Sequence, residues 1–330
     1  MGDIYHIPHD NGKDYRLKKF VEYQHEVPSI HYRFMGEYIK KHNFDLNRTL
    51  DMCWYMSVTY NEITCILLDE LYHKGYSYEE IWDKFRDILN FGSSRKYAKN
   101  MNWFIPLMKE WRTMTNNNPL EWLRLKNKPN SEQTYKVIQR ELRNKKFVGR
   151  FASDLFLESI TYLKDYIGIN IKQPSLIDWK YCSNETSGIF NIFYEDEKAN
   201  LYDKKRNLTE RDIIYLTSRI QQIQAEIKKT YPEQNAEIGM FIGKICSFRN
   251  LFKNARYGGF HHDRQLQVIK EYEKVLPEYE YLWKECYDLR KTMFDKRFLG
   301  ELNGWNGIRK ERKKLWLTTG LTGAEKESLK

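Results

Sequence analysis

Apolar residues recur at intervals of three and four along most of this chain, and this spacing restricts its fold more than any other feature. Between Asn43 and His73 the recurring residues are Leu46, Leu50, Cys53, Trp54, Ile63, Ile66, Leu67 and Leu71. A second stripe comprises Ile238, Phe241, Ile242, Ile245, Phe248 and Phe252. Such spacing places apolar side chains on one face of an α-helix. Because 41% of the 330 residues are hydrophobic, the chain can bury a large core, and we expect a mainly α protein.

Capping and turn residues set the limits of the other predicted elements. Gly75 ends the first helix, and Ser77 with Glu80 forms a capping-box pattern ahead of Ile81. Further helices are predicted from about Glu132 to Lys145, from Ala152 to Tyr166, from an N-cap at Thr209 to Pro232, and from about Asp263 to Phe294. Residues 115–130 and 173–205 are rich in turn residues, so we expect loops there, with room for a small hairpin in the second stretch.

The chain shows no internal repeat and no long linker. We therefore expect one helical domain, compact or bilobal, over residues 30–295, with an N-terminal extension (1–29) and a basic tail (296–330). The formal charge is +10, and the segment from Arg290 to Lys330 holds 11 basic against 5 acidic residues. This charge suits a polyanionic partner, and a solvated basic tail explains it equally well.

Absent motifs exclude several protein classes. No apolar run is long enough for a membrane span and the N-terminus is charged, so we expect a cytoplasmic protein. The cysteines are odd in number and form no CxxC pair, which predicts free thiols at Cys53, Cys65, Cys182, Cys246 and Cys286. Phosphate-loop, dinucleotide-binding and nucleophile-elbow glycine motifs are missing, as are HExxH and zinc-deaminase patterns, so no resident metal site is predicted.

The densest polar segment runs from Cys246 to Arg264. Cys246 and Arg249 share a helix face, and the Gly258-Gly259 pair allows a turn that returns His261 to Arg264 toward them. Arginines in this segment can form bidentate hydrogen bonds with phosphate, and a histidine beside Asp263 can be held in one tautomer for proton transfer. A basic helix C-terminus followed by Asp263 as the next N-cap explains the same residues structurally.

Three further clusters have both a functional and a structural interpretation. The irregular segment from Asp178 and Lys180 through Ser187 to Asn191 packs ionic and polar groups together, as site loops and ordinary surface loops both do. Tyr60-Asn61 interrupts an apolar helix, where the asparagine needs a structural or a substrate partner. Arg150 precedes Asp154 by four residues, so a surface ion pair explains it adequately.

In their order along the chain these segments resemble the phage DNA-hypermodification family of amino acid:DNA transferases, also called alpha-glutamyl/putrescinyl thymine pyrophosphorylases. The resemblance rests on a TYN-like motif at Thr59–Glu62, a GRF-type motif at Val148–Phe151, a D-W segment at Asp178-Trp179 leading to TSGxFNxFY at Thr186–Tyr194, and a CSFRxLF…RYxGxxxDR block at Cys246–Arg264. It covers about residues 30–270. The chain departs from the family where it has Gly-Gly-Phe-His-His instead of a tyrosine-rich stretch.

The resemblance implies a helical, DNA glycosylase-like bilobal fold and an enzyme that acts on thymine bases within double-stranded DNA. A separate DNA kinase would first pyrophosphorylate hydroxymethyluracil on its 5-CH2 oxygen. An amine, either an amino acid such as glycine or glutamate or a polyamine such as putrescine, then displaces pyrophosphate. Two alternatives are a helical base-excision enzyme, which would leave abasic sites, and a non-catalytic basic DNA-binding module.

The implied chemistry assigns expected roles to residues of the matching motifs. The candidates for stabilising departing pyrophosphate, alone or with Mg²⁺, are Arg249, Arg256 and Arg264. The candidates for the base that deprotonates the attacking ammonium are Asp178, Asp263 and His261. Cys246 is a candidate for transient nucleophilic attack, and Tyr60, Tyr257 or Trp179 would stack on an extruded base. The remaining candidate substrate contacts are Asn61, Arg150, Lys180, Ser187 and Asn191.

Overall fold

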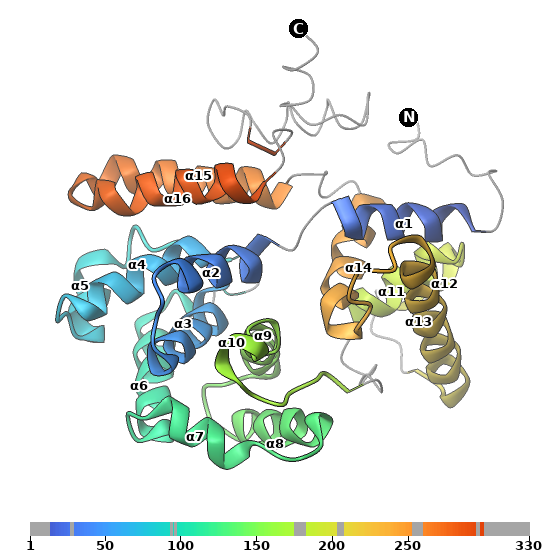
Figure 1. Ribbon diagram of the computed structural model, residues 1–330, viewed down its shortest axis with the longest axis horizontal. Coiled ribbons are helices and arrows are strands. Elements are labelled where there is room, and N and C mark those ends of the chain that lie inside the picture. Colours follow the sequence, from blue (N-terminus) through green and yellow to red (C-terminus); the bar gives the residue numbers. More distant parts are fainter. Residues whose placement is uncertain are drawn as a thin grey trace, which may run out of the picture. The chain divides into compact units, whose positions relative to one another are not determined.

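The computed structural model describes residues 14–26, 30–92, 95, 98–174, 183–202, 208–252, 260–294 and 298–299. Within these ranges all regular elements are helices and no strand occurs, which confirms the mainly α class (Figure 1). The chain forms two compact units. The smaller unit comprises residues 1–29, 173–260 and 300–330, and the larger unit comprises residues 30–172 and 261–299. None of the described helices combines the length and the apolar character needed to cross a membrane.

The larger unit contains eleven α-helices of the described chain and the short 3-10 turn Pro277–Tyr279. They are α2 (Ile30–Lys41), α3 (Leu46–Thr59), α4 (Glu62–His73), α5 (Tyr78–Phe85), α6 (Met101–Thr115), α7 (Pro119–Lys126), α8 (Ser131–Arg143), α9 (Arg150–Tyr162), α10 (Lys164–Ile167), most of α15 (Phe260–Val275), the turn Pro277–Tyr279 and α16 (Glu280–Met293). Helix α3 packs against α4, α6, α7 and α9, and every residue from Thr49 to Thr59 is buried (Figure 1).

Stacked tryptophans form the centre of the larger unit's core. The rings of Trp54 and Trp111 lie 4.8 Å apart at 10°, and the ring of Phe156 meets both edge-on. Their polar atoms are satisfied, because Trp54 donates to the carbonyl of Leu107 and Trp111 donates to Asp51. Burial raises the pKa of Asp51, although Arg112 and Trp111 both act to lower it. The high aromatic content of the sequence is therefore used in part to fill this core.

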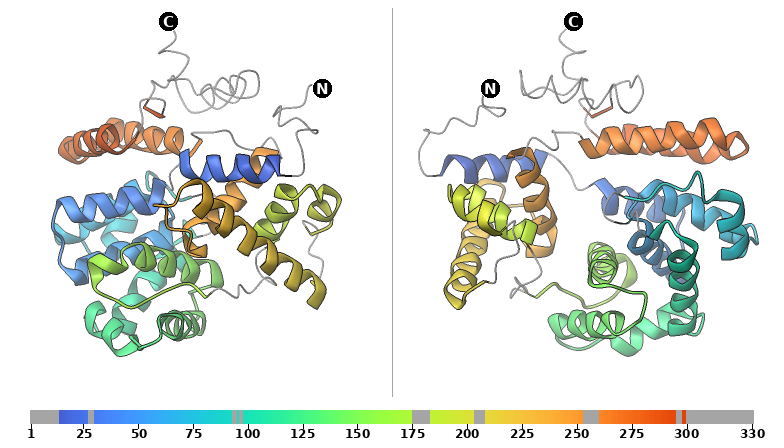
Figure 2. Two further views of the ribbon diagram at one scale, coloured as in Figure 1. Left: turned by 45° about the vertical axis from the view of Figure 1, so that its right-hand side comes forward. Right: turned by 180° about the vertical axis from the view of Figure 1, so that it is seen from behind.

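The smaller unit contains α1 (Tyr15–Glu26), α11 (Ser183–Ile192), α12 (Asp196–Tyr202), α13 (Glu210–Thr230) and α14 (Ile238–Phe252). Its core includes the predicted apolar stripe of α14 from Ile238 to Phe248, with Phe241 and Ile245 fully buried. Helices α11 and α14 lie side by side (Figure 2). A Cβ on Gly188 would stand only 2.5 Å from Cγ2 of Ile245, so the close approach of these two helices requires glycine at this position.

The predicted helix limits are confirmed where a cap defines them. Ser77 and Glu80 form the capping box of α5, and Thr209 caps α13 through a second box with Asp212. Helix α8 also matches its predicted span. The described cysteines are free thiols, as expected, and these are Cys53, Cys65, Cys246 and Cys286. Cys182 lies outside the described residues.

Four expectations about the elements are wrong. The loop expected over 115–130 contains α7, which Asn118 caps by accepting a hydrogen bond from the Glu121 amide. The loop or hairpin expected over 173–205 contains α11 and α12. The single helix expected from Asn43 to His73 is broken between α3 and α4, and the one expected up to Phe294 is broken between α15 and α16. Asparagine caps start α7 and α4, and Pro277 follows the end of α15, features that apolar periodicity alone does not report.

Candidate functional site

The break between α3 and α4 is built by the motif Thr59–Glu62. Tyr60 has φ 48° and ψ 44°, a left-handed conformation that is uncommon for a residue with a large side chain. Asn61 caps α4 by accepting a hydrogen bond from the Thr64 amide at 3.0 Å. The amide of Gly92 donates to the carbonyl of Thr59, and a Cβ on Gly92 would stand 2.6 Å from the Tyr60 carbonyl oxygen. The motif therefore fixes the direction in which Tyr60 and Glu62 leave the backbone.

Glu62 lies in the first turn of α4 and is paired with a histidine from another helix. Its Oε2 atom lies 2.5 Å from Nδ1 of His31 on α2, and its Oε1 atom accepts a hydrogen bond of 2.7 Å from Gln265 on α15. The side chain of Glu62 is only 3% exposed, whereas that of His31 is 16% exposed. Burial alone would raise the pKa of Glu62, but the charge and hydrogen bond of His31 and the bond from Gln265 outweigh it, so the pKa is lowered.

Two aromatic rings adjoin His31. The ring of His261, on α15, meets the His31 ring edge-on with centroids 5.1 Å apart, and the Tyr60 ring lies at 4.9 Å. The ring of Phe151, at the start of α9, packs against Tyr60 at 5.8 Å. We call His31, Tyr60, Glu62, His261 and Gln265 the His31 cluster. It brings the first and the last of the sequence motifs together around a histidine that belongs to neither.

A buried arginine supports the cluster from α16. Arg290 is 2% exposed and donates to Oε1 of Gln265 at 2.5 Å and to the carbonyl of His262 at 3.0 Å. Burial lowers the pKa of Arg290 to about 10, although the charge of Asp263 acts to raise it. The ring of His262 is buried between those of Phe294 and Phe298. Asp263 is therefore a buried neighbour of Arg290, and His262 is a core residue.

The other candidates in the larger unit make contacts that organise the fold. Asp263 lies inside the first turn of α15, so the expectation that it is the N-cap is wrong. Arg264 donates to Oδ1 of Asn90 at 2.6 Å, which ties α15 to the segment after α5. Arg150 forms the expected pair with Asp154, at 3.7 Å.

The candidates in the smaller unit lie on α11 and α14. Burial lowers the pKa of Arg249, which is 7% exposed, while the charge of Glu185 acts in the opposite direction. Cys246 is partly exposed, and its carbonyl accepts a hydrogen bond from the Asn250 side chain. The hydroxyl of Ser187 donates to the carbonyl of Ala199 at 3.1 Å.

Asn191 belongs to a network that joins three segments of the smaller unit. The side-chain amide of Asn191 donates to Asp196 at 2.7 Å. Arg16 on α1 donates to the backbone carbonyl of Asn191 and to the carboxylate of Asp196. The guanidinium of Arg16 also lies over the ring of Tyr194. This network holds α1, α11 and α12 together.

Several predicted site residues lie outside the described residues, namely Asp178, Trp179, Lys180, Arg256 and Tyr257. Within the described residues, Cys246 and Arg249 belong to the smaller unit, whereas His261, Asp263 and Arg264 belong to the larger one. The predicted return of His261 toward Arg249 stays a prediction. No group of three or more His, Cys, Asp or Glu side chains in the described ranges is arranged to hold a metal ion.

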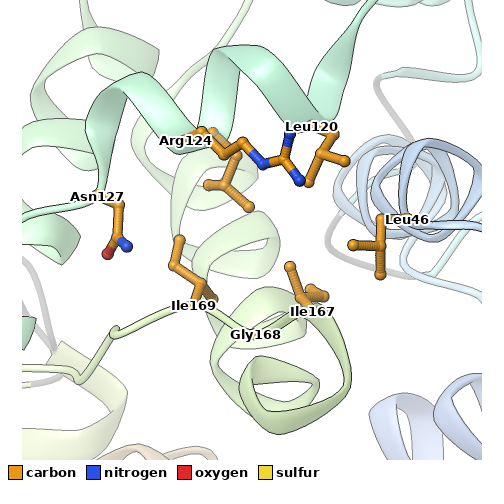
Figure 3. Close-up of a pocket in the computed structure, with 8 residues that line it drawn as sticks. Leu46, Leu120, Arg124, Asn127, Ile167, Gly168 and Ile169 are labelled. Carbon is orange, nitrogen blue, oxygen red and sulfur yellow. The ribbon is translucent and has the colours of Figure 1, made fainter.

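A separate cavity of about 110 Å³ lies in the larger unit between α3, α7 and the end of α10 (Figure 3). Its walls are mainly Leu and Ile side chains, with Arg124 and Asn127 beside them. None of the residues expected to form a site lines this cavity. The His31 cluster is therefore the better candidate for chemistry.

Sequence reasoning missed His31, Gln265 and Arg290, and it gave Glu62 no role. The one local signal in the sequence is Glu62 itself, which directly precedes the mainly apolar segment Ile63–Leu68. A carboxylate buried there is stable only if another group pairs with it. The partners come from three other helices, so no spacing rule connects them.

No protein-family model, no curated protein and no solved structure matches this chain.

Proposed function

We propose that this protein is an amine:DNA transferase that replaces the pyrophosphate of 5-pyrophosphoryloxymethyluracil in DNA with an amine. The single observation that carries the proposal is the His31 cluster, in which Tyr60 and His261 both lie against the His31–Glu62 pair. Tyr60 and Glu62 come from the first motif of the family resemblance and His261 from the last. The cluster combines an imidazole–carboxylate pair with an aromatic ring, and the proposed reaction needs both.

The chemistry requires a proton acceptor and an aromatic surface. An ammonium group must lose a proton before its nitrogen can attack the 5-CH2 carbon. The new C–N bond forms as the C–O bond to pyrophosphate breaks, and the nitrogen then releases a second proton. An imidazole paired with a carboxylate can accept the first proton, and a tyrosine ring can stack on the extruded base.

The surface of the larger unit also suits a DNA substrate. Trp103, on α6, is 39% exposed, and its ring meets that of Phe147 edge-on at 5.9 Å. The ammonium group of Lys146 lies 5.4 Å from the centre of the Phe147 ring. Exposed aromatic rings beside cations are typical of surfaces that bind unpaired nucleotides, and the protein carries a formal charge of +10.

The substrate base would come from an enzyme that pyrophosphorylates hydroxymethyluracil in DNA. The DNA glycosylase-like fold, the cytoplasmic location and Mg²⁺ accompanying the pyrophosphate stay predictions. The choice among glycine, glutamate and putrescine also stays open, because a single cationic or anionic contact can decide it.

A pyrophosphate-release assay tests the proposal. DNA containing the pyrophosphorylated base is incubated with the protein and, separately, with glycine, glutamate or putrescine, while DNA containing only hydroxymethyluracil is the control. We expect release with at least one amine and none from the control DNA. Strand breaks after alkali without pyrophosphate release would instead support base excision, and DNA binding with neither product would support a non-catalytic module.

A further inference from the structure

We infer that His31 is the general base of the proposed reaction and that Glu62, Gln265 and Arg290 are positioning residues that fix its tautomer. This inference rests on the proposed function for the identity of the reaction. The fixing of the tautomer does not depend on the identity of the reaction, so the two can fail separately.

The first step of the argument is the location of the hydrogen between His31 and Glu62. The hydrogen bonds that Glu62 accepts from His31 and Gln265 act to lower its pKa and favour an ionised carboxylate, which can only accept hydrogen bonds. The hydrogen in the 2.5 Å contact is therefore carried by Nδ1 of His31. A neutral imidazole with its hydrogen on Nδ1 has its lone pair on Nε2.

The second step concerns Nε2 of His31. Among the described residues, the Nδ1 contact with Glu62 is the only hydrogen bond of the His31 ring. The side chain remains 16% exposed, and the rings of Tyr60 and His261 adjoin it. Nε2 can therefore accept a proton from an ammonium group that approaches between these rings, and Glu62 then stabilises the imidazolium that forms.

The third step is the hydrogen-bond chain behind Glu62. Arg290 donates to Oε1 of Gln265, which orients the Gln265 amide so that its Nε2 atom donates to Glu62 at 2.7 Å. The Arg290 guanidinium can only donate, so it determines which end of the Gln265 amide faces Glu62. Gln265 and Arg290 are 3% and 2% exposed, so water does not compete for these bonds. The chain holds Glu62 as an acceptor directed at Nδ1 of His31.

Nitrogen NMR of protein labelled in its histidine rings tests the positioning role without any substrate. At a pH where His31 is neutral, we expect the Nδ1–H tautomer in the wild-type protein. In Glu62→Gln the carbonyl of the new amide accepts from Gln265 and its NH2 group faces Nδ1 of His31, so we expect the Nε2–H tautomer. Gln265→Met should shift the wild-type population toward a mixture of the two tautomers. Glu37→Gln, on the same helix as His31 and paired with Lys40 at the surface, is the control and should leave the tautomer unchanged.

Single-turnover transfer from the active amine tests the catalytic role. We expect His31→Ala to lower the rate by about 100-fold or more, and added imidazole to restore part of it, which a misfolded variant could not show. A wild-type His31 with its hydrogen on Nε2, or a Glu62→Gln variant with an unchanged tautomer, would overturn the positioning role. Near-normal transfer by His31→Ala would overturn the assignment of the base. The Nδ1–H tautomer in a protein that transfers no amine would count against the proposed function and leave the positioning role intact.

Discussion

At the scale of single residues, three residues of the motif Thr59–Glu62 shape the backbone, and the fourth, Glu62, contacts the proposed base. Thr59 and Asn61 use their side chains to end one helix and begin the next. Tyr60 absorbs the change of direction with a left-handed backbone, a conformation that costs about 1–3 kcal/mol and persists only where neighbours enforce it. Glu62 then pairs its carboxylate with His31 on α2 through a hydrogen bond of 2.5 Å.

Gly92 is the neighbour that enforces this geometry, and its substitution should disturb the cluster. In Gly92→Ala the new Cβ would stand 2.6 Å from the Tyr60 carbonyl oxygen, so one of the two segments must shift. We expect a loss of about 1–3 kcal/mol in the free energy of unfolding, together with reduced transfer. Gly243→Ala, inside α14, is the control, because no neighbouring group lies within 4 Å of its added Cβ. Equal losses in the free energy of unfolding for the two variants, measured by urea unfolding, would contradict this prediction.

The lowered pKa of Glu62 gives the protein an acid-dependent contribution to stability. Because the folded-state pKa lies below the unfolded value, this contribution is fully present above the ordinary range of glutamate and is lost as the pH falls through the folded value. The difference in the free energy of unfolding between wild type and Glu62→Gln should therefore be present above the ordinary range of glutamate and shrink as the pH falls below about 4.3. Urea titrations at several pH values measure this free-energy difference. A difference that grows in acid would show that folding raises the pKa of Glu62 and does not lower it.

At the scale of helices, the sequence predicts which segments are helical better than it predicts how they end and what they face. The capping boxes of α5 and α13 are encoded by adjacent side chains, so they were predictable. Helix α11 was not, because its polar residues and glycine resemble a loop. Gly188 instead allows α14 to approach, and Ser187 bonds to the carbonyl of Ala199, contacts that depend on residues distant along the chain.

The surface formed by the start of α6 and the segment before α9 should bind unpaired DNA. Trp103→Ala should weaken binding of a single-stranded thymidine oligonucleotide by about 1–3 kcal/mol, because one stacking surface is lost. Lys146→Ala should lower the dependence of log affinity on log salt by about one. Leu125→Ala, another exposed apolar residue of the larger unit, is the control. Fluorescence anisotropy at several salt concentrations measures the DNA affinity of all three variants. If Trp103→Ala binds as tightly as the Leu125→Ala control, this surface does not bind DNA.

At the scale of the whole molecule, the candidate residues are distributed over two compact units. Tyr60, Asn61, Arg150 and the α15 residues belong to the larger unit, and the α11 and α14 residues belong to the smaller one. Sequence periodicity reports the buried face of each helix and does not report which helices share a core. The mainly α class was therefore predictable, whereas the pairing of His31 with Glu62 required the packing of α2, α4 and α15.

Mass spectrometry of intact nucleosides tests the central claim most directly. DNA carrying the pyrophosphorylated base is incubated with the protein and a ¹⁵N-labelled amine, either glycine, glutamate or putrescine, and is then digested to nucleosides. We predict a modified nucleoside whose mass equals that of 5-hydroxymethyldeoxyuridine plus the labelled amine minus one water, and its loss in His31→Ala. Pyrophosphorylated nucleoside recovered unchanged with all three amines, from protein that binds the DNA, would contradict the account.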